Sequence, residues 1–493
     1  MTQSSQFTRF FLTHQPEEAF QESVNPFKAL ERSFKRFYAP APATTALPPE
    51  EMEKKYPWMR WQILESTFLG YATFYLVRNN LAPAQAAFGE AMGYDKTMLG
   101  TIITATAISY GMGKFIMGGM SDRSNPRVFM ATGLILSAIC NFLFGMAEDY
   151  HAHLFLWSLN GFFQGMGWGP CGRSLGHWFA LRERGTIFGV WNIAHNVGGA
   201  TIGALSGYLA KNYGWENAFI VPGVIALIGA AYLIWRLRDT PQSVGLPPVE
   251  SYIKQHPNRA LDFSGKSYKE SGTNDHEPEI LHHPEVDDPE RELTTKELFF
   301  NYILTNPALW LFALCNFFVY IGRYSLLDWG PTYLAEEKGA TLLQGGNSNT
   351  IFEVAGIFST LLVGWLSDRL GGRRGMVSLL CLIPILGSVI AIWMIPPGHL
   401  YLDLFFFGVI GFFIYPPVML LGVAGLDFTS KKAVGAAAGF IGLFGYAGRA
   451  VQGTGLGWIA ENYGWHASLS AIAVCMMLAI ILLSFTWKLR PHS

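Results

Sequence analysis

Charged residues are scarce in this sequence. Lysine, arginine, aspartate and glutamate make up 14% of the 493 residues, whereas about 25% is typical of a soluble domain. Half of the residues are apolar and 15% are aromatic. The composition therefore excludes an ordinary soluble globular protein and indicates a chain that crosses a membrane several times.

Cysteines are few, and no cleavable secretion signal is visible. The first 50 residues are polar and lack a short apolar core before a small-residue site, so we expect the first apolar segment to be retained as a helix. A thiol inside an apolar segment usually serves as a small packing group, and we predict no disulfide. The five cysteines, all in or beside apolar segments, are Cys140, Cys171, Cys315, Cys381 and Cys475.

Apolar segments of about 20 residues, the length of a helix that crosses a bilayer, recur along the chain. We predict twelve of them, and therefore an all-α integral membrane protein with twelve transmembrane helices. The predicted spans start near residues 61, 98, 128, 153, 186, 216, 307, 346, 375, 401, 435 and 465.

Basic residues gather in alternate connections between these spans. Arg123, Arg182, Arg369 and Lys431 mark the connections on one side, whereas the connections on the other side hold only scattered lysines. Because lysine and arginine concentrate on the cytoplasmic side of a membrane, we predict that both chain ends and the long central loop are cytoplasmic.

Short motifs recur in the two halves of the chain at a nearly constant spacing. Gly-x-x-x-Asp-Arg ends at Arg123 and again at Arg369, and Asn-Tyr-Gly-Trp ends at Trp215 and again at Trp465. Such a repeat predicts two six-helix halves with a binding site near the midplane between them. We predict a cytoplasmic N-terminal extension (1–55), an N-terminal half (56–236), a cytoplasmic central loop (237–303), a C-terminal half (304–488) and a cytoplasmic tail (489–493).

The segments outside the two halves are polar. Residues 25–38 place apolar side chains at helical spacing, which is typical of an interfacial helix or of a helix with another partner. The central loop is rich in proline and acidic residues, and we expect much of it to be mobile. Its histidines His276, His282 and His283 are interpreted as part of a solvated loop. We predict no metal, no cofactor and no nucleic-acid partner.

Two arginines occupy equivalent positions in the first span of each half. Arg78 ends a Tyr-x-x-Arg motif that begins at Tyr75, and Arg323 ends one that begins at Tyr320. A guanidinium in the bilayer costs about 2.5–3.5 kcal/mol or more, so it is seldom there without a partner or a ligand. Because its planar fork matches the geometry of a phosphate, the pair predicts a clamp for an anion.

The repeated Gly-x-x-x-Asp-Arg loops favour a mechanical role. Small residues allow neighbouring helices to approach each other, and the acidic and basic side chains can bridge helix ends on the cytoplasmic side. We predict that such ion pairs hold one face closed and release it when the halves rock. The residues involved are Asp122, Arg123, Asp368 and Arg369.

Longer motifs resemble one family closely over about residues 55–488. They are SDRSNPRVF (121–129), GFFQGMGWGPCGR (161–173), WNIAHNVGG (191–199), RDTPQSVGLPP (238–248), RYSLLDWGPTYL (323–334) and KKAVGAAAGFIGLFGY (431–446). With these motifs the chain is similar to the organophosphate:phosphate antiporters of the major facilitator superfamily, in particular the bacterial glycerol-3-phosphate transporters. The resemblance implies the major facilitator fold and exchange of inorganic phosphate for an organophosphate by alternating access in a bacterial inner membrane.

The resemblance also implies roles for individual residues. Arg78 and Arg323 correspond to the phosphate-binding arginines of the family, Lys114 to a lysine that follows a tyrosine in the second span, and His195 to a histidine in the cavity. Tyrosines at positions where the family lines the same cavity are Tyr71, Tyr75, Tyr110, Tyr320, Tyr415 and Tyr446.

The chain departs from the family pattern at two intramembrane positions. Asn79 follows Arg78 where many members have a lysine. Because asparagine is neutral, this position cannot form an ion pair with an acidic partner such as Asp328. Arg449 stands where close relatives often have a small residue. Because Glu353 and Arg449 should lie at similar depths at about 1.5 Å per residue, we predict that they pair and that Arg449 is structural.

Other functions remain open at this point. A sugar-phosphate sensor of the same fold is an alternative, as is a transporter of phosphoglycerate, phosphoenolpyruvate or hexose phosphate. A membrane phosphatase is disfavoured because no nucleophile motif or metal-ligand set accompanies the arginines, and we predict a non-enzyme. The expected partners are the organophosphate, inorganic phosphate and the lipid bilayer, with a monomer as the functional unit.

Overall fold

The computed structural model describes residues 38–121, 123–256, 300, 303–369, 374–427 and 434–487. Residues 25–37 of the predicted interfacial helix, Asp122, residues 257–299 of the central loop with its histidine cluster, and the predicted tail lie outside these ranges. The described residues form α-helices joined by short connections, with one short 3₁₀ turn.

Eight helices form the first half within the residues that the structure describes. α4 and α5 are separated by a short break, as are α8 and α9, and each of these pairs makes one interrupted crossing. The helices are α4 (Pro49–Leu76), α5 (Leu81–Met92), α6 (Lys96–Ser121), α7 (Pro126–Met146), α8 (Tyr150–Gln164), α9 (Trp168–Trp178), α10 (Leu181–Tyr213) and α11 (Asn217–Arg236).

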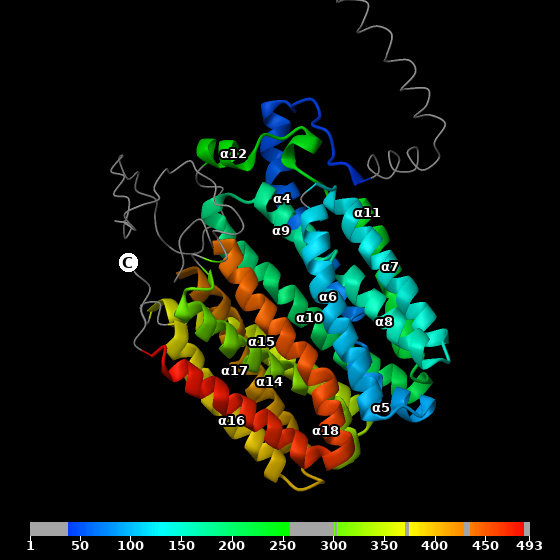
Figure 1. Cartoon of the computed structure of the whole chain (residues 1–493). Helices are drawn as coiled ribbons and strands as arrows, with labels where there is room; N and C mark the ends of the chain where they lie inside the picture. The colour runs from blue at the N-terminus through cyan, green and yellow to red at the C-terminus, as the bar shows by residue number, and fades with distance from the viewer. Residues whose placement is uncertain are drawn as a thin grey trace, which may run out of the picture.

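The described part of the second half contains five long helices, and the last of them breaks at Gly464 into two crossings. Within the described residues the chain therefore crosses twelve times, which confirms the predicted fold class. The blue to green helices of the first half lie beside the yellow to red helices of the second (Figure 1). The helices are α14 (Pro307–Lys338), α15 (Leu342–Arg369), α16 (Arg374–Met394), α17 (Leu400–Asp427) and α18 (Val434–Ser484).

The sequence repeat is visible in the backbone. Asn125 and Asn306 each cap a helix that begins with proline, accepting hydrogen bonds from backbone N–H groups of the first turn. The two Asn-Tyr-Gly-Trp motifs make equivalent turns, because Gly214 has φ 94° and Gly464 has φ 79°. Only glycine adopts such values readily, which explains why the motif contains glycine in both halves.

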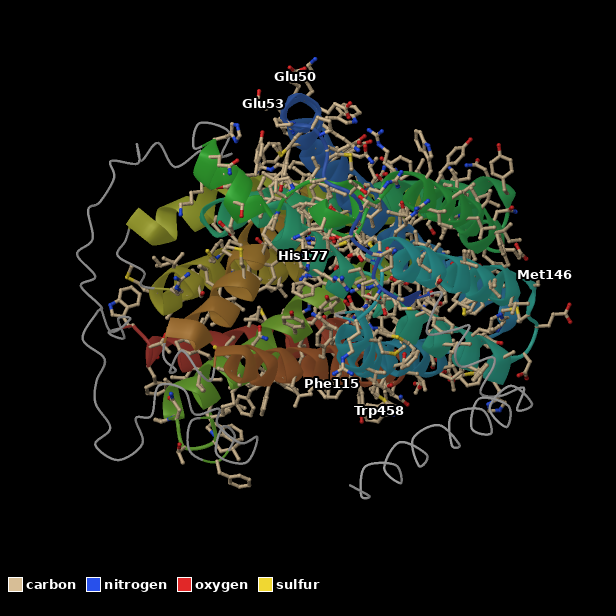
Figure 2. The ribbon with its side chains drawn as sticks, turned by 90° about the horizontal axis from the view of Figure 1, so that it is seen from above. Glu50, Glu53, Phe115, Met146, His177 and Trp458 are labelled. Atoms are coloured by element: carbon tan, nitrogen blue, oxygen red, sulfur yellow. The ribbon has the colours of Figure 1, made fainter. Side chains whose placement is uncertain are left out.

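Six segments of the described residues are long and apolar enough to cross a membrane by themselves. Other crossing helices are more polar because they face protein: α6 packs on α18, and α10 packs on α15, across the boundary between the halves. Phe115 and Trp458 point outward from the bundle (Figure 2), as side chains in contact with lipid would. The six segments are Pro126–Met146, Asn217–Arg236, Pro307–Lys338, Arg374–Met394, Leu400–Gly422 and Gly439–Ser484.

The two halves contact each other along the part of their helices that runs from the middle of the bundle to one of its faces. We call this the outer face; the opposite, inner face carries the start of α4 and the end of α11 and is the side that we predict to be cytoplasmic. Near the outer face, Lys96 of the first half pairs with Glu336 at 3.1 Å and Glu461 at 3.6 Å. A Cβ on Gly100 would collide with the carbonyl of Gly453. The structure is therefore closed on its outer side.

A short cap covers the inner end of the first half. It consists of residues 38–56 and 239–256 and includes α12 (Val249–Gln255), which lies beside the start of α4 at the top of Figure 1. Tyr56 stacks on Tyr252 with ring centroids 3.9 Å apart. The Asp239 carboxylate accepts hydrogen bonds from the Arg173 guanidinium at 3.0 Å and from the Ala41 backbone N–H at 2.8 Å. The first part of the central loop thus belongs to the folded core.

Asp239→Ala should destabilise the protein by about 3 kcal/mol, because it removes the carboxylate that pairs with the half-buried Arg173 guanidinium and that anchors the cap. Thermal unfolding of detergent-purified protein measures the loss. Asp149→Ala is the matched control: Asp149 caps α8, accepting from the Ala152 backbone N–H at 3.0 Å, and its loss should cost about 1 kcal/mol. Equal losses in the two variants would contradict a special role for Asp239.

Candidate functional site

The break between α4 and α5 places Arg78 in the middle of the bundle. At the break, amide side chains of neighbouring helices bond to backbone groups that lack a partner within the helix. The Val77 carbonyl accepts hydrogen bonds from Asn141 at 3.0 Å and from Asn160 at 2.8 Å. Asn80 in turn donates to Asn141 at 2.8 Å. Irregular backbone at membrane depth is tolerated only where it is satisfied in this way, so the amides hold Arg78 in position.

Aromatic rings surround the Arg78 guanidinium. Its central carbon lies 4.7 Å from the ring centroid of Tyr75 and 4.3 Å from that of Tyr110, and the side chain is buried. No carboxylate among the described residues forms an ion pair with Arg78. The ring faces stabilise the cation and leave its net charge in place.

Arg323 lies in the middle of α14 with a comparable environment. Its guanidinium donates to the Tyr415 hydroxyl at 3.1 Å and lies 4.4 Å from the centroid of the same ring. The Tyr415 hydroxyl donates in turn to the Glu353 carboxylate. Within the described part of the chain, Arg323 contacts Glu353 only through this tyrosine and forms no direct ion pair.

His195 and Asn196 of α10 connect the two halves at this level. The ring centroid of His195 is 5.8 Å from that of Tyr75 and 5.6 Å from that of Tyr415. Nδ1 of His195 bonds to the carbonyl of Asn192, so Nε2 is the ring nitrogen that can bond to another group. The Asn196 amide donates to the Glu353 carboxylate at 2.8 Å.

Further tyrosines extend the cluster toward Lys114. Tyr110 of the first half meets Tyr446 of the second, with ring centroids 5.4 Å apart, and Tyr320 lies 5.9 Å from Tyr446. The Lys114 ammonium is 5.5 Å from the Tyr446 ring. Together with Tyr71, which lies 5.5 Å from Tyr75, the ten residues that the resemblance assigned to substrate form one connected cluster.

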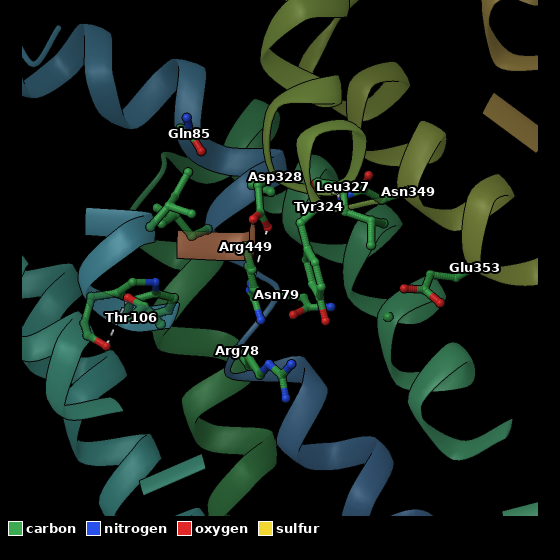
Figure 3. Close-up of a pocket in the computed structure, with 15 residues that line it drawn as sticks. Arg78, Asn79, Gln85, Thr106, Tyr324, Leu327, Asp328, Asn349, Glu353 and Arg449 are labelled. Carbon is green, nitrogen blue, oxygen red and sulfur yellow. Dashed lines mark hydrogen bonds and ion pairs between the residues drawn. The ribbon is translucent and has the colours of Figure 1, made fainter. Parts of the chain in front are cut away.

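A cavity lies beside Arg78 within the bundle (Figure 3). Its walls come from both halves of the chain. The polar and charged residues that line it are Arg78, Asn79, Gln85, Thr106, Tyr324, Asp328, Asn349, Glu353 and Arg449.

The predicted pairing of Glu353 with Arg449 is wrong. Arg449 pairs with Asp328, with 3.9 Å between its guanidinium nitrogen and the carboxylate oxygen, whereas Glu353 faces Asn196 and Tyr415. Equal depth did not determine the partner, because the two side chains leave their helices in different directions. Arg449 therefore supplies the cation next to Asp328. This chain has Asn79 at the position after Arg78, where many family members have a lysine that could pair with such an acidic residue.

The predicted gating residues are described only in part. Arg123 is exposed at the inner end of α6. Asp368 and Arg369 lie in the last turn of α15, but their side chains fall outside the described structure, as does Asp122. Their role as a gate stays a prediction.

Several residues of the site were not predicted from the sequence. Asn80, Asn141 and Asn160 brace the helix break, and Trp191 stacks on Tyr71 with centroids 4.8 Å apart. Gln85 and Asn349 line the cavity. The available signal was polarity: amide side chains within apolar spans require partners, and they mark positions that face the bundle interior.

Comparison with known proteins identifies the family. The model of the Major Facilitator Superfamily matches residues 67–453. The chain belongs to this superfamily. It is 40% identical over 455 residues to a probable hexose phosphate transport protein of Chlamydia trachomatis serovar D, an alignment that covers 90% of this chain and 96% of the relative. This major facilitator protein is thus a multi-pass membrane protein of a transporter family and not an enzyme.

Two other relatives differ in function. The glycerol-3-phosphate transporter of Bacillus subtilis is 39% identical, covering 92% of this chain and 97% of the relative. The membrane sensor protein UhpC of Escherichia coli is 36% identical, covering 90% and 96%. The chain is accordingly a member of the organophosphate transporter family, as the motifs indicated, but similarity alone does not separate glycerol phosphate from hexose phosphate.

The fold is also found among solved structures. The crystal structure of a bacterial homolog of the human lysosomal transporter Spinster, in an inward-facing and unoccupied conformation, superimposes with a TM-score of 0.68. It covers 87% of this chain and 97% of that protein at 14% identity. This match shows that the two proteins share the major facilitator fold.

Proposed function

We propose that this protein exchanges inorganic phosphate for an organophosphate by alternating access, with Arg78 and Arg323 as the phosphate-binding residues. One observation carries the proposal: two arginines of equivalent helices are buried at the centre of the bundle, and within the described residues neither pairs directly with a carboxylate. Two such cations are costly in a bilayer unless an anion accompanies them. A phosphate dianion supplies two charges and acceptor oxygens for both guanidinium forks.

The surrounding residues fit the same chemistry. Tyrosine hydroxyls and the Lys114 ammonium are hydrogen-bond donors, and His195 reaches toward both halves between Tyr75 and Tyr415. Since each half contributes one arginine, a bound phosphate relieves their mutual repulsion as the halves close on it. The loaded protein should therefore change conformation more easily than the empty one, which favours exchange over one-way transport.

Glycerol 3-phosphate is the organophosphate that we propose, in a bacterial inner membrane with both chain ends cytoplasmic and the monomer as the transporting unit. The motif resemblance and the Bacillus subtilis relative support the substrate, and the distribution of basic residues supports the orientation. A sensor function is the second candidate, since one relative is a membrane sensor protein.

Counterflow in proteoliposomes tests the proposal. Vesicles loaded with phosphate should take up labelled glycerol 3-phosphate at least about tenfold faster than vesicles without phosphate. A membrane potential should have little effect, because exchange of equal charges avoids the cost of about 2.3 kcal/mol per charge per 100 mV. Equal uptake in both kinds of vesicle would contradict exchange, and binding without uptake would favour the sensor.

A further inference from the structure

The cavity beside Arg78 contains one polar side chain that no residue satisfies. Gln85 of α5 is fully buried, and within the described part of the chain neither its amide nitrogen nor its amide oxygen has a hydrogen-bond partner. Gln85 lines the cavity and lies at the opposite end of the view from Arg78 (Figure 3). A buried amide without partners costs free energy, so this group points to a ligand.

Three further lining residues of this cavity are neutral and carry hydrogen-bonding groups: Asn349, Asn79 and Thr106. Asn349 donates its amide N–H to the Leu327 carbonyl at 2.9 Å, while its own amide oxygen is buried and unpaired. Asn79 and Thr106 line the same space. Hydroxyl groups both donate and accept, and they are therefore the ligand groups that match these side chains.

Charge decides against an acidic ligand group. Around the cluster and the cavity lie four cations, Arg78, Arg323, Arg449 and Lys114, and two carboxylates, Asp328 and Glu353. These six groups sum to two positive charges, which a phosphate dianion balances. Asp328 is held by Arg449 at 3.9 Å and by the Gln452 amide at 2.8 Å, so Arg449 is already paired. A third negative charge on the substrate would stay uncompensated in a buried site.

We propose that this cavity binds the hydroxylated, uncharged part of a phosphate monoester, with Gln85 as a specificity-determining residue. The inference rests on the proposed function, because it takes the phosphate of the ester to lie at Arg78. It names the substrate class as polyol or sugar monophosphates and excludes carboxylated phosphates such as phosphoglycerate.

Binding to the detergent-purified protein, measured by isothermal titration calorimetry, tests this without mutation. The probes are inorganic phosphate, glycerol 3-phosphate, propyl phosphate and 3-phosphoglycerate. Glycerol 3-phosphate should bind at least about tenfold more tightly than propyl phosphate, which has the same carbon chain without hydroxyls, and than 3-phosphoglycerate. Equal affinity for the glycerol and propyl esters, or tighter binding of 3-phosphoglycerate, would overturn the proposal.

Gln85→Leu removes the amide at similar volume. It should weaken glycerol 3-phosphate binding by about tenfold and bring it close to that of propyl phosphate, whereas the affinity for phosphate should change by less than about threefold. Gln62→Leu is the matched control, because Gln62 is a buried glutamine of α4 that donates to the Arg236 carbonyl at 2.6 Å, away from the cavity. It should leave the ratio of the two affinities unchanged. Equal weakening of phosphate and glycerol 3-phosphate by Gln85→Leu would contradict a role in specificity.

The two proposals fail in different ways. Selective binding of the glycerol ester without exchange in proteoliposomes would refute transport and retain the binding cavity. Phosphate exchange without discrimination between the glycerol and propyl esters would refute the cavity and retain transport. Failure of phosphate and all three esters to bind would refute both.

Discussion

Arg78→Lys and Arg323→Lys are each expected to lower phosphate exchange by at least about a hundredfold while the protein still inserts and folds. Lysine keeps the charge but replaces a planar fork of five donors with a single point charge. The forks here lie against the rings of Tyr75, Tyr110 and Tyr415, which orient them. A misplaced donor in a buried anion site typically costs a factor of about a hundred or more.

Exchange of labelled phosphate in proteoliposomes measures this effect, and size-exclusion chromatography shows whether each variant folds. Arg236→Lys is the matched control: Arg236 is an arginine of the same membrane domain, but it lies at the inner end of α11 and pairs with Glu65 at 3.1 Å. It should keep nearly normal exchange. Normal exchange in Arg78→Lys or Arg323→Lys would remove that residue from the binding site.

Breaking the Asp328–Arg449 pair should cost about 3 kcal/mol of stability, because either Arg449→Gln or Asp328→Asn leaves the other charge inside the bundle without its ion-pair partner. The double variant should lose much less than the sum of the single losses. Arg449 also lies 4.0 Å over the ring of Tyr324, so the loss at Arg449 should be slightly the larger. Thermal unfolding in detergent, with and without phosphate, measures each step of this double-mutant cycle.

Glu353→Gln provides the comparison in the same cycle. Its carboxylate is bonded to Asn196 and Tyr415, so its loss should add to that of Arg449→Gln without coupling. Additive losses for the Asp328 and Arg449 variants would contradict the pairing. Coupling between Glu353 and Arg449 would restore the partner that we first predicted from helix depth.

The sequence alone determined the architecture and the family of this protein. Three patterns can be recognised in the sequence without any information on packing. They are the twelve apolar spans, the recurrence of Asn-Tyr-Gly-Trp, and the equivalent positions of Arg78 and Arg323. Gly214 and Gly464 adopt positive φ in both halves, as the repeated motif requires. These features could be predicted because hydropathy and turn chemistry act locally.

Only the tertiary structure decided which side chains meet. Helix depth placed Glu353 and Arg449 together, but the rotation of each helix turned Arg449 toward Asp328 and Glu353 toward Tyr415. In the same way, Asn141 and Asn160 brace the break before Arg78, and Gln85 faces a cavity between the halves. The direction of a side chain around its helix is set by packing against several other helices at once, and this information is spread over residues that lie far apart in the sequence.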